Sequence, residues 1–292
     1  MTLHKLLATA ADRLAGVSDT PRLDAELLLA DAMGVDRMEL MLVMQKMHSG
    51  SNGEMSANAR ALLAGFAMRI ERRMAHEPIA YILGRRDFWT ISLAVAPGVL
   101  IPRPDSETLI EAAVAHFGDD GPLRILDLGT GPGTLLLAAL DQWPDASGLG
   151  IEASDDAIAM ARANADAIAP GRAEIRKGNW AEGITEPFDL ILCNPPYVED
   201  EASLDPQVRD WEPAGALFGG ADGLDCYRRI VPQLAALLAP GGMAALEIGH
   251  NQADTVAALF REAGLEPKLR RDLAGRPRAL IHFALGNESK SG

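Results

Sequence analysis

An amide side chain, two prolines and an aromatic ring follow one apolar run of this 292-residue chain. They are Asn194, Pro195, Pro196 and Tyr197, and the run before them, residues 188–193, is typical of a buried strand. The Asn194 oxygen and the Pro195 carbonyl can each accept one N–H of a planar NH2 group, and the two prolines keep the backbone extended. Tyr197 can pack its ring on the same group. Because the lone pair of such a nitrogen is delocalised and attacks poorly, this set suits methylation of an amide or a base amine.

A glycine-rich turn upstream of this motif indicates the cofactor. It comprises Gly129, Thr130, Gly131, Pro132 and Gly133, between a strand-like run at residues 123–128 and a helical run at residues 135–140. Alternate glycines let the backbone approach a ligand closely. The third glycine comes one residue too early for the dinucleotide fingerprint G-x-G-x-x-G. S-adenosylmethionine carries no pyrophosphate, so the turn suits its methionine moiety better than it suits NAD.

Three further residues complete the predicted cofactor site. Glu152 ends the strand-like run 147–151, about twenty residues after the turn, where an acidic side chain binds ribose hydroxyls in nucleoside-binding folds. Asn179 and Trp180 follow the run 173–177, so they can meet adenine through a hydrogen bond and through ring packing. A lid over the hydrophobic core is the alternative role for Trp180.

The elements around these residues predict an α/β fold. From residue 123 onward, strand-like runs alternate with helical stretches, as in a doubly wound, mostly parallel sheet. The expected helices span residues 155–168, 224–238 and 252–263. All the predicted site residues then follow strands, at the edge of the sheet where ligands bind in such folds.

The first part of the chain is predicted to be helical. Thr20 and Pro21 are a good cap and first-turn pair for a helix over residues 22–33, and Gly34 ends it. Another helix is expected over residues 56–74. Alternation in residues 88–95 and 99–101 predicts a β-hairpin that joins this part to the rest. The expected organisation is a helical domain at 1–76, a hairpin linker at 77–104 and a catalytic domain at 105–292.

Composition is that of a globular protein, with 48% hydrophobic and 23% charged residues. Residues 1–86 hold 11 Lys and Arg against 10 Asp and Glu, whereas the remaining residues hold 16 against 31. Such an acidic part repels a phosphate backbone. The chain has no signal-peptide pattern and only two, widely separated cysteines, so we expect a cytoplasmic protein. Its histidines are scattered, so no metal site is expected.

With these residues in view, the chain resembles the class I S-adenosylmethionine-dependent methyltransferases. It is most similar to the protein-(glutamine N5) methyltransferases that modify peptide-chain release factors. Besides the two motifs above, the resemblance rests on residues 78–84 (PIAYILG), 100–104 (LIPRP), 219–225 (GGADGLD) and 246–249 (LEIG). It departs from the family pattern at Asp105-Ser106-Glu107, where Glu-Thr-Glu is usual, and at Glu152 and Asn179, where Asp is usual.

The resemblance implies a seven-stranded sheet that ends in a hairpin of residues 266–270 and 279–284, and an N-terminal helical domain that recognises the substrate. It implies that Gly129 to Gly133, Glu152, Trp180 and Asn194 bind S-adenosylmethionine. Asn194 and Pro195 to Tyr197 would form the substrate pocket, with Asn194, Pro195 and Tyr197 catalytic. The implied target is the glutamine of the Gly-Gly-Gln motif in class 1 release factors, and we expect the enzyme to act as a monomer.

Three other functions compete with this hypothesis. An N6-adenine methyltransferase acting on DNA or RNA can use the same four residues, but it needs a basic groove and stacking aromatics, and only 5% of the residues are aromatic. In a non-catalytic cofactor-binding protein, residues 194–197 are only a proline-rich turn. A nicotinamide-dependent oxidoreductase conflicts with the glycine spacing.

Overall fold

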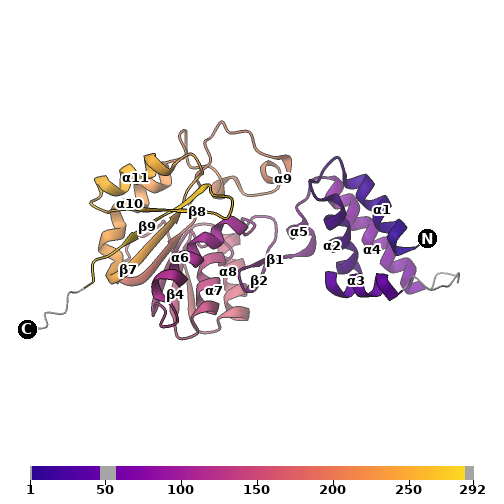
Figure 1. The fold of residues 1–292 in the computed structure, drawn as a ribbon, viewed down its shortest axis with the longest axis horizontal. Helices are drawn as coiled ribbons and strands as arrows, with labels where there is room; N and C mark the ends of the chain where they lie inside the picture. The colour runs from indigo at the N-terminus through magenta and orange to yellow at the C-terminus, as the bar shows by residue number, and fades with distance from the viewer. Residues whose placement is uncertain (1, 47–56, 287–292) are drawn as a thin grey trace, which may run out of the picture. The chain divides into compact units, whose positions relative to one another are not determined.

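The computed structural model describes residues 2–46 and 57–286 (Figure 1). The chain divides into two compact units. One comprises Met1–Gly84 and Asp205–Trp211, and the other comprises Arg85–Leu204 and Glu212–Gly292. A short segment of the second half of the sequence therefore belongs to the first unit.

The first unit is helical. Its helices are α1 (Leu3–Leu14), α2 (Pro21–Met33), α3 (Arg37–Lys46), α4 (Ala57–Met74), α5 (Ile79–Leu83) and the short α9 (Pro206–Arg209). Pro21 is the first residue of α2, and Gly34 ends the helix in the left-handed conformation with φ 68°, as the sequence predicts. The predicted helix over residues 56–74 is also found, although Ser56 lies outside the described residues.

Apolar side chains and a buried ion pair hold this unit together. The core is formed by side chains of α1 to α5, among them Leu7, Leu14, Leu28, Leu29, Leu40, Phe66, Ile70 and Ile82. Arg73 of α4 lies among them and pairs with Asp24 of α2 at 2.8 Å. Arg73 also donates to the carbonyl of Val17 and to the side chain of Gln207. This one guanidinium thus ties α9 to the helices of the N-terminal part.

The second unit contains a seven-stranded sheet. Its strands are β3 (Arg124–Leu128), β4 (Ser147–Glu152), β5 (Ala173–Lys177), β6 (Phe188–Cys193), β7 (Leu238–Glu247), β8 (Lys268–Arg271) and β9 (Pro277–Phe283). Their order is β5-β4-β3-β6-β7-β9-β8. The first five are parallel, and β9 runs antiparallel to both β7 and β8. The predicted doubly wound, mostly parallel sheet with a terminal hairpin is confirmed.

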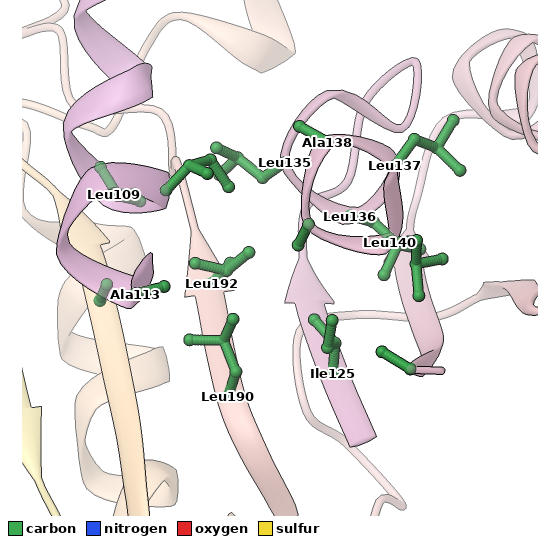
Figure 2. Close-up of a cluster of buried hydrophobic side chains, with 14 of the residues drawn as sticks. Leu109, Ala113, Ile125, Leu135, Leu136, Leu137, Ala138, Leu140, Leu190 and Leu192 are labelled. Carbon is green, nitrogen blue, oxygen red and sulfur yellow. The ribbon is translucent and has the colours of Figure 1, made fainter. Parts of the chain in front are cut away.

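Helices cover both faces of this sheet (Figure 1). The helices α6 (Glu107–Phe117), α7 (Thr134–Gln142) and α8 (Asp155–Ile168) pack on one face, and α10 (Asp225–Leu237) and α11 (Ala253–Glu262) pack on the other. Leu190 and Leu192 of β6 point to the first group, as Figure 2 shows, whereas Ile191 and Cys193 point to the second. This alternation explains why β6 is apolar throughout: both of its faces are buried.

The β-hairpin lies earlier than the sequence predicts. Its strands are β1 (Arg85–Phe88) and β2 (Ile91–Ala94), and residues 99–101 are not a strand. Its turn lies at Trp89 and Thr90, where Trp89 has a φ of 54°. Asn164 of α8 holds the last residue of β2, because its side chain bonds both the N–H and the carbonyl of Ala94, at 2.9 and 3.0 Å. Val99 and Ile101 are instead buried in an irregular segment that begins with a turn, in which the Val99 amide donates to the Ala96 carbonyl at 3.3 Å. Alternating apolar residues are typical of a strand and of such a segment alike, which is why the prediction was wrong here.

Among residues 2–46 and 57–286, we find no helix that combines the length and the apolar character needed to cross a membrane.

Replacing Leu192 with alanine tests the packing of the sheet. Leu192 is fully buried between β6 and the helices of one face, so the variant leaves a cavity and should lose about 2 to 5 kcal/mol of unfolding free energy. Leu273→Ala is the matched control, since Leu273 is 99% exposed and its truncation should change stability by less than about 0.5 kcal/mol. Chemical denaturation measures both; equal stabilities would contradict the packing described.

Candidate functional site

The site lies where the strand order reverses. β3 is paired with β4 on one side and with β6 on the other, so the chain builds the sheet outward from β3 in both directions. At such a switch point, the loops that follow the two central strands leave in opposite directions and open a crevice at the carboxyl edge. The glycine-rich turn follows β3, and Asn194 follows β6. Both predicted motifs therefore meet at this crevice.

A cavity of about 520 Å³ occupies the crevice. Of the residues predicted from the sequence, it is lined by Gly129, Gly131, Glu152, Asn179, Trp180, Asn194 and Pro196. Thr130 and Pro132 line a smaller pocket of about 30 Å³ that shares Gly129, Gly131 and Asn194 with the first. Gly133, Pro195 and Tyr197 are not among the lining residues of either. Gly133 is the N-cap residue of α7, Pro195 is buried, and Tyr197 points its hydroxyl into the protein.

The glycine-rich turn needs glycine for two different reasons. Gly129 and Gly131 have φ of 72° and 57°, in the left-handed region that other residues rarely adopt. At Gly129, a Cβ would also lie 3.1 Å from the Trp180 ring, whereas at Gly131 a Cβ would meet nothing within 4 Å. The amides of Gly129 and Thr130 both donate to the carbonyl of Ile151 in β4. The turn is thus fixed to the neighbouring strand, and its Gly131 side stays open to the cavity.

Glu152 binds three backbone amides. One carboxylate oxygen accepts from Gly131 at 2.9 Å, and the other accepts from Ala153 and Ser154 at 2.8 and 2.9 Å. A carboxylate offers roughly four acceptor positions. Glu152 therefore links the glycine turn to the end of β4 and still keeps acceptor capacity at the cavity wall.

Asn179 and Trp180 form the far wall. The Asn179 amide nitrogen donates to Glu182 at 2.7 Å, which leaves its oxygen to face a ligand. Trp180 has a φ of 54°, packs against the apolar core under the sheet and also lines the cavity. From the sequence, covering the core and contacting the ligand are alternative roles for Trp180. In the structure, its side chain both packs on the core and lines the cavity.

A buried acid, Asp127 of β3, lies below the turn. Its Oδ2 accepts from the Thr130 hydroxyl at 2.6 Å and from the Leu136 amide at 3.2 Å. Its Oδ1 is buried and has no hydrogen-bond partner in the part of the chain that the structure describes. Burial raises the pKa of Asp127 to about 7, although the two hydrogen bonds oppose this shift. Asp127 lines the smaller pocket, so a cationic group there would meet an unpaired carboxylate oxygen.

A network of buried polar side chains supports the Asn194 motif. The Asn194 amide nitrogen donates to the Ser106 hydroxyl at 3.1 Å, and Ser106 donates to Glu247 Oε2 at 2.5 Å. The Tyr197 hydroxyl donates to the other oxygen of the same carboxylate at 3.2 Å. Glu247 is the last residue of β7, the parallel neighbour of β6, and Leu246 is opposite Cys193. One carboxylate is therefore connected to both ends of the motif.

Burial dominates the ionisation of this network. Glu247 is fully buried, which raises its pKa to about 7, while bonds from Ser106 and Tyr197 and the charge of Arg278 act in the opposite direction. Burial also raises the pKa of the Tyr197 hydroxyl, and the neighbouring Glu247 adds to that shift. Tyr197 therefore stays protonated and can act as a donor to Glu247.

An ion pair fixes one edge of the cavity. Glu212 accepts from Arg103 at 2.6 Å and from the Ile101 amide at 3.2 Å. It thereby ties the segment that begins at Glu212 to residues 101–103. The cavity is lined by residues beside both segments, at positions 98–100 and at 213, 215 and 216. The Glu212 side chain is almost fully buried, whereas that of Arg103 is one-third exposed.

Sequence reasoning did not assign site roles to Ser106, Asp127, Glu212 and Glu247. A signal was present for two of them. Asp127 is the one acid of β3 and Glu247 the one acid of β7, two mostly apolar strands, and an acid buried in this way usually has specific partners. For Ser106 and Glu212 we find no such local signal.

Two family models match the chain. One, described as the PrmC N-terminal domain, matches residues 5–84, and the other, the methyltransferase small domain, matches residues 106–209. Among curated proteins, the release factor glutamine methyltransferase of Caulobacter vibrioides is 41% identical over 288 residues, which covers 96% of each chain. The protein of that name from Rhodospirillum rubrum is 43% identical over 287 residues, or 96% of this chain and 85% of that protein.

Two solved structures of low identity have a similar fold. A methyltransferase from Pyrococcus furiosus aligns with a TM-score of 0.51 at 18% identity, covering 75% of this chain and 99% of that one. A 16S rRNA N2 G1207 methyltransferase from Thermus thermophilus, solved with AdoMet and guanosine, aligns with a TM-score of 0.51 at 21% identity, covering 68% and 49%. These similarities concern architecture alone.

The buried state of Asp127 predicts how stability depends on pH. Its pKa is raised from 3.8 to about 7, so the folded protein binds a proton more readily than the unfolded chain between these values. The contribution of Asp127 to the free energy of unfolding is full below about pH 4 and is lost as the pH rises through about 7. Between these pH values, loss of the Asp127 proton lowers the free energy of unfolding as the pH rises. Asp127→Asn should make this dependence on pH less steep by up to about 1.4 kcal/mol per pH unit. Parallel stability curves for Asp127→Asn and the unaltered protein would contradict this.

Proposed function

Because the chain belongs to the release factor glutamine methyltransferases, we propose that it transfers a methyl group from S-adenosylmethionine to the side-chain amide nitrogen of a glutamine in a release factor. The observation that carries this proposal is Asn194, which lines the cavity while its amide nitrogen is held by Ser106. Its oxygen thus remains an acceptor beside a cavity walled by a glycine turn. The target that we propose is the glutamine of the Gly-Gly-Gln motif in class 1 release factors.

The residues around the cavity fit S-adenosylmethionine. The orphaned Oδ1 of Asp127 suits the ammonium of the methionine moiety, since that group brings a positive charge to an unpaired buried oxygen. Glu152 suits the ribose diol, and Trp180 with the free oxygen of Asn179 suits adenine. The proposed cofactor site consists of Gly129, Thr130, Gly131, Pro132, Gly133, Glu152, Asn179, Trp180 and Asn194. When bound, the cofactor supplies an electrophilic methyl group on a sulfonium.

The protein's own part in the reaction is orientation. Asn194 Oδ1 and the Pro195 carbonyl would each accept one N–H of the glutamine amide, which turns the nitrogen lone pair toward the methyl carbon. Holding two reactants in line can lower a barrier by several kcal/mol, about 7 to 11 in favourable cases. Pro196 limits the movement of this loop, and Tyr197, anchored through its hydroxyl to Glu247, packs beside the planar substrate group. We assign the catalytic roles to Asn194, Pro195 and Tyr197.

We propose that the helical domain binds the release factor. Residues 1–76 carry the helices α1 to α4, residues 77–104 link them to the catalytic part, and residues 105–292 hold the cavity and its motifs. We propose that the enzyme acts as a monomer, in the cytoplasm, where release factors work. Its strongly acidic second part makes nucleic acid a poor substrate.

A transfer assay tests the proposal directly. The protein is incubated with labelled S-adenosylmethionine and either a release factor or nucleic acid, and mass spectrometry locates the methyl group. We expect one methyl on the glutamine of Gly-Gly-Gln, and none when that glutamine is replaced by alanine. Methyl groups on adenine instead would establish the competing function and refute ours.

Asn194→Ala should reduce turnover by about 100- to 1000-fold, because it removes an oriented acceptor from the reacting nitrogen. Asn194→Asp keeps an acceptor and nearly the same volume, so its turnover should lie between those of the alanine variant and the unaltered enzyme. Asn251→Ala, at an exposed asparagine outside the cavity, is the control. Full activity in Asn194→Ala would contradict the proposed role of Asn194 as an acceptor for the substrate amide.

Glu152→Ala should weaken S-adenosylmethionine binding by about 10- to 150-fold, as expected for losing charge-assisted hydrogen bonds to the ribose. Calorimetry with the isolated protein measures this, and Glu152→Gln should show a smaller loss because one acceptor oxygen remains. Glu174→Ala removes an exposed acid of the neighbouring strand β5 and should leave affinity unchanged. Unaltered affinity in Glu152→Ala would take Glu152 out of the cofactor site.

A further inference from the structure

The proposed reaction requires that one particular end of the Asn194 amide faces the substrate. An asparagine side chain presents an acceptor oxygen at one end and a donor NH2 at the other. A half-turn of the amide would place the NH2 against the N–H groups of the substrate glutamine, and the two sets of donors would repel each other. Something in the protein must therefore distinguish the two orientations.

We propose that Ser106 and Glu247 are positioning residues that fix the Asn194 oxygen toward the substrate. This inference rests on the proposed function and concerns how the same site works. Ser106 has one hydroxyl proton, and it points to Glu247 Oε2 at 2.5 Å. The oxygen of Ser106 can then only accept from Asn194, so Asn194 must turn its NH2 to Ser106, as found at 3.1 Å.

While Glu247 is ionised, burial makes this order of donors and acceptors strict. Ser106 is 2% exposed and Glu247 is 0% exposed, so solvent offers neither group an alternative partner. A buried polar group without a partner costs about 1 to 3 kcal/mol. The ionised carboxylate only accepts, so it attracts the Ser106 proton and, through it, orients the amide of Asn194.

The second oxygen of Glu247 orients the other end of the motif. It accepts from the Tyr197 hydroxyl at 3.2 Å, which limits rotation of the Tyr197 ring. Asn194 follows the carboxyl end of β6, and Glu247 is the last residue of the adjacent strand β7. The strand register therefore brings the carboxylate to the motif. The Glu247 carboxylate then fixes the orientation of both the Asn194 amide, through Ser106, and the Tyr197 ring.

Other charged and titratable groups that face Glu247 come from several elements. Arg278 of β9 lies 4.0 Å from Oε1 and favours the ionised form, while Asp105, beside Ser106, disfavours it. Tyr227 of α10 donates to the backbone carbonyl of Glu247, not to its carboxylate. Cys193 of β6, whose own pKa is raised by burial, adds no positive charge. Arg278 is thus the only cation among these neighbours.

Protonation of Glu247 would reverse the order. Because Oε1 still accepts from the Tyr197 hydroxyl, the added proton lies on Oε2 and is donated to Ser106. The Ser106 proton then turns to Asn194, which presents its oxygen to Ser106 and its NH2 to the substrate. Because burial raises the pKa of Glu247 to about 7, the productive orientation should dominate above this pH and decline below it. Turnover should fall accordingly as the pH drops through about 7.

The first test is a double-mutant cycle on Ser106 in the full-length enzyme. Ser106→Ala should lower kcat about 10-fold, the value of a hydrogen bond of about 1.4 kcal/mol, with the KM for release factor and the cofactor Kd changed less than about threefold. Ser106→Thr keeps the hydroxyl and should restore kcat to within about threefold. In an Asn194→Ala background, Ser106→Ala should have no further effect, because its target is gone. A multiplicative loss in that background, or full activity of Ser106→Ala alone, would overturn the proposal.

The second test is the pH profile of kcat for Glu247→Gln. Glutamine has nearly the same volume and cannot lose a proton between pH 5 and 9, so kcat should be reduced and should no longer rise through about pH 7. The unaltered enzyme should show that rise at saturating cofactor and release factor. The same rise in Glu247→Gln would assign the titration to another group and overturn the role of Glu247.

Discussion

The parallel pairing of β3 with β6 is the constraint on which the site depends. Leu128 and Cys193 are opposite each other at the ends of these strands, so the segments that follow both leave the sheet at the same edge. The glycine turn and Asn194 lie 60 or more residues apart in the sequence, yet this register brings both to one cavity. A slip of one residue would turn every side chain of β6 to the opposite face and would exchange the two layers of the core.

The same sheet buries two carboxylates at this edge, Asp127 on β3 and Glu247 on β7. Both have a pKa raised to about 7 by burial, and hydrogen bonds oppose that shift at each. Their surroundings differ in one respect: Glu247 is bonded through both oxygens, whereas Asp127 has one oxygen without a partner in the ranges that the structure covers. A fully bonded acid orients its neighbours, whereas the oxygen of Asp127 that lacks a partner is the one to which we propose that the cofactor's ammonium binds.

Much of this arrangement follows from the sequence. The strands β3, β4, β5 and β6 were predicted within one residue because each is an apolar or alternating run bounded by turn residues, and α8 was predicted with the bounds observed. The hairpin was misplaced because its turn lies at Trp89, a residue other than glycine with a φ of 54°, and because the alternating apolar residues 99–101 are buried without forming a strand. The roles of Ser106 and Glu247 could not be predicted because the bonds that define them join residues 88 and 141 positions apart in the sequence. Local periodicity reports which face of an element is buried, but it carries no information about distant polar partners.

A structure of the protein with S-adenosylhomocysteine and a Gly-Gly-Gln peptide would test the central claim most directly. The account predicts that the glutamine amide nitrogen lies within about 3.2 Å of both Asn194 Oδ1 and the Pro195 carbonyl, while the Asn194 nitrogen stays on Ser106. The peptide's nitrogen should face the sulfur of the product cofactor. A peptide bound with its amide oxygen toward Asn194, or outside the cavity altogether, would contradict it.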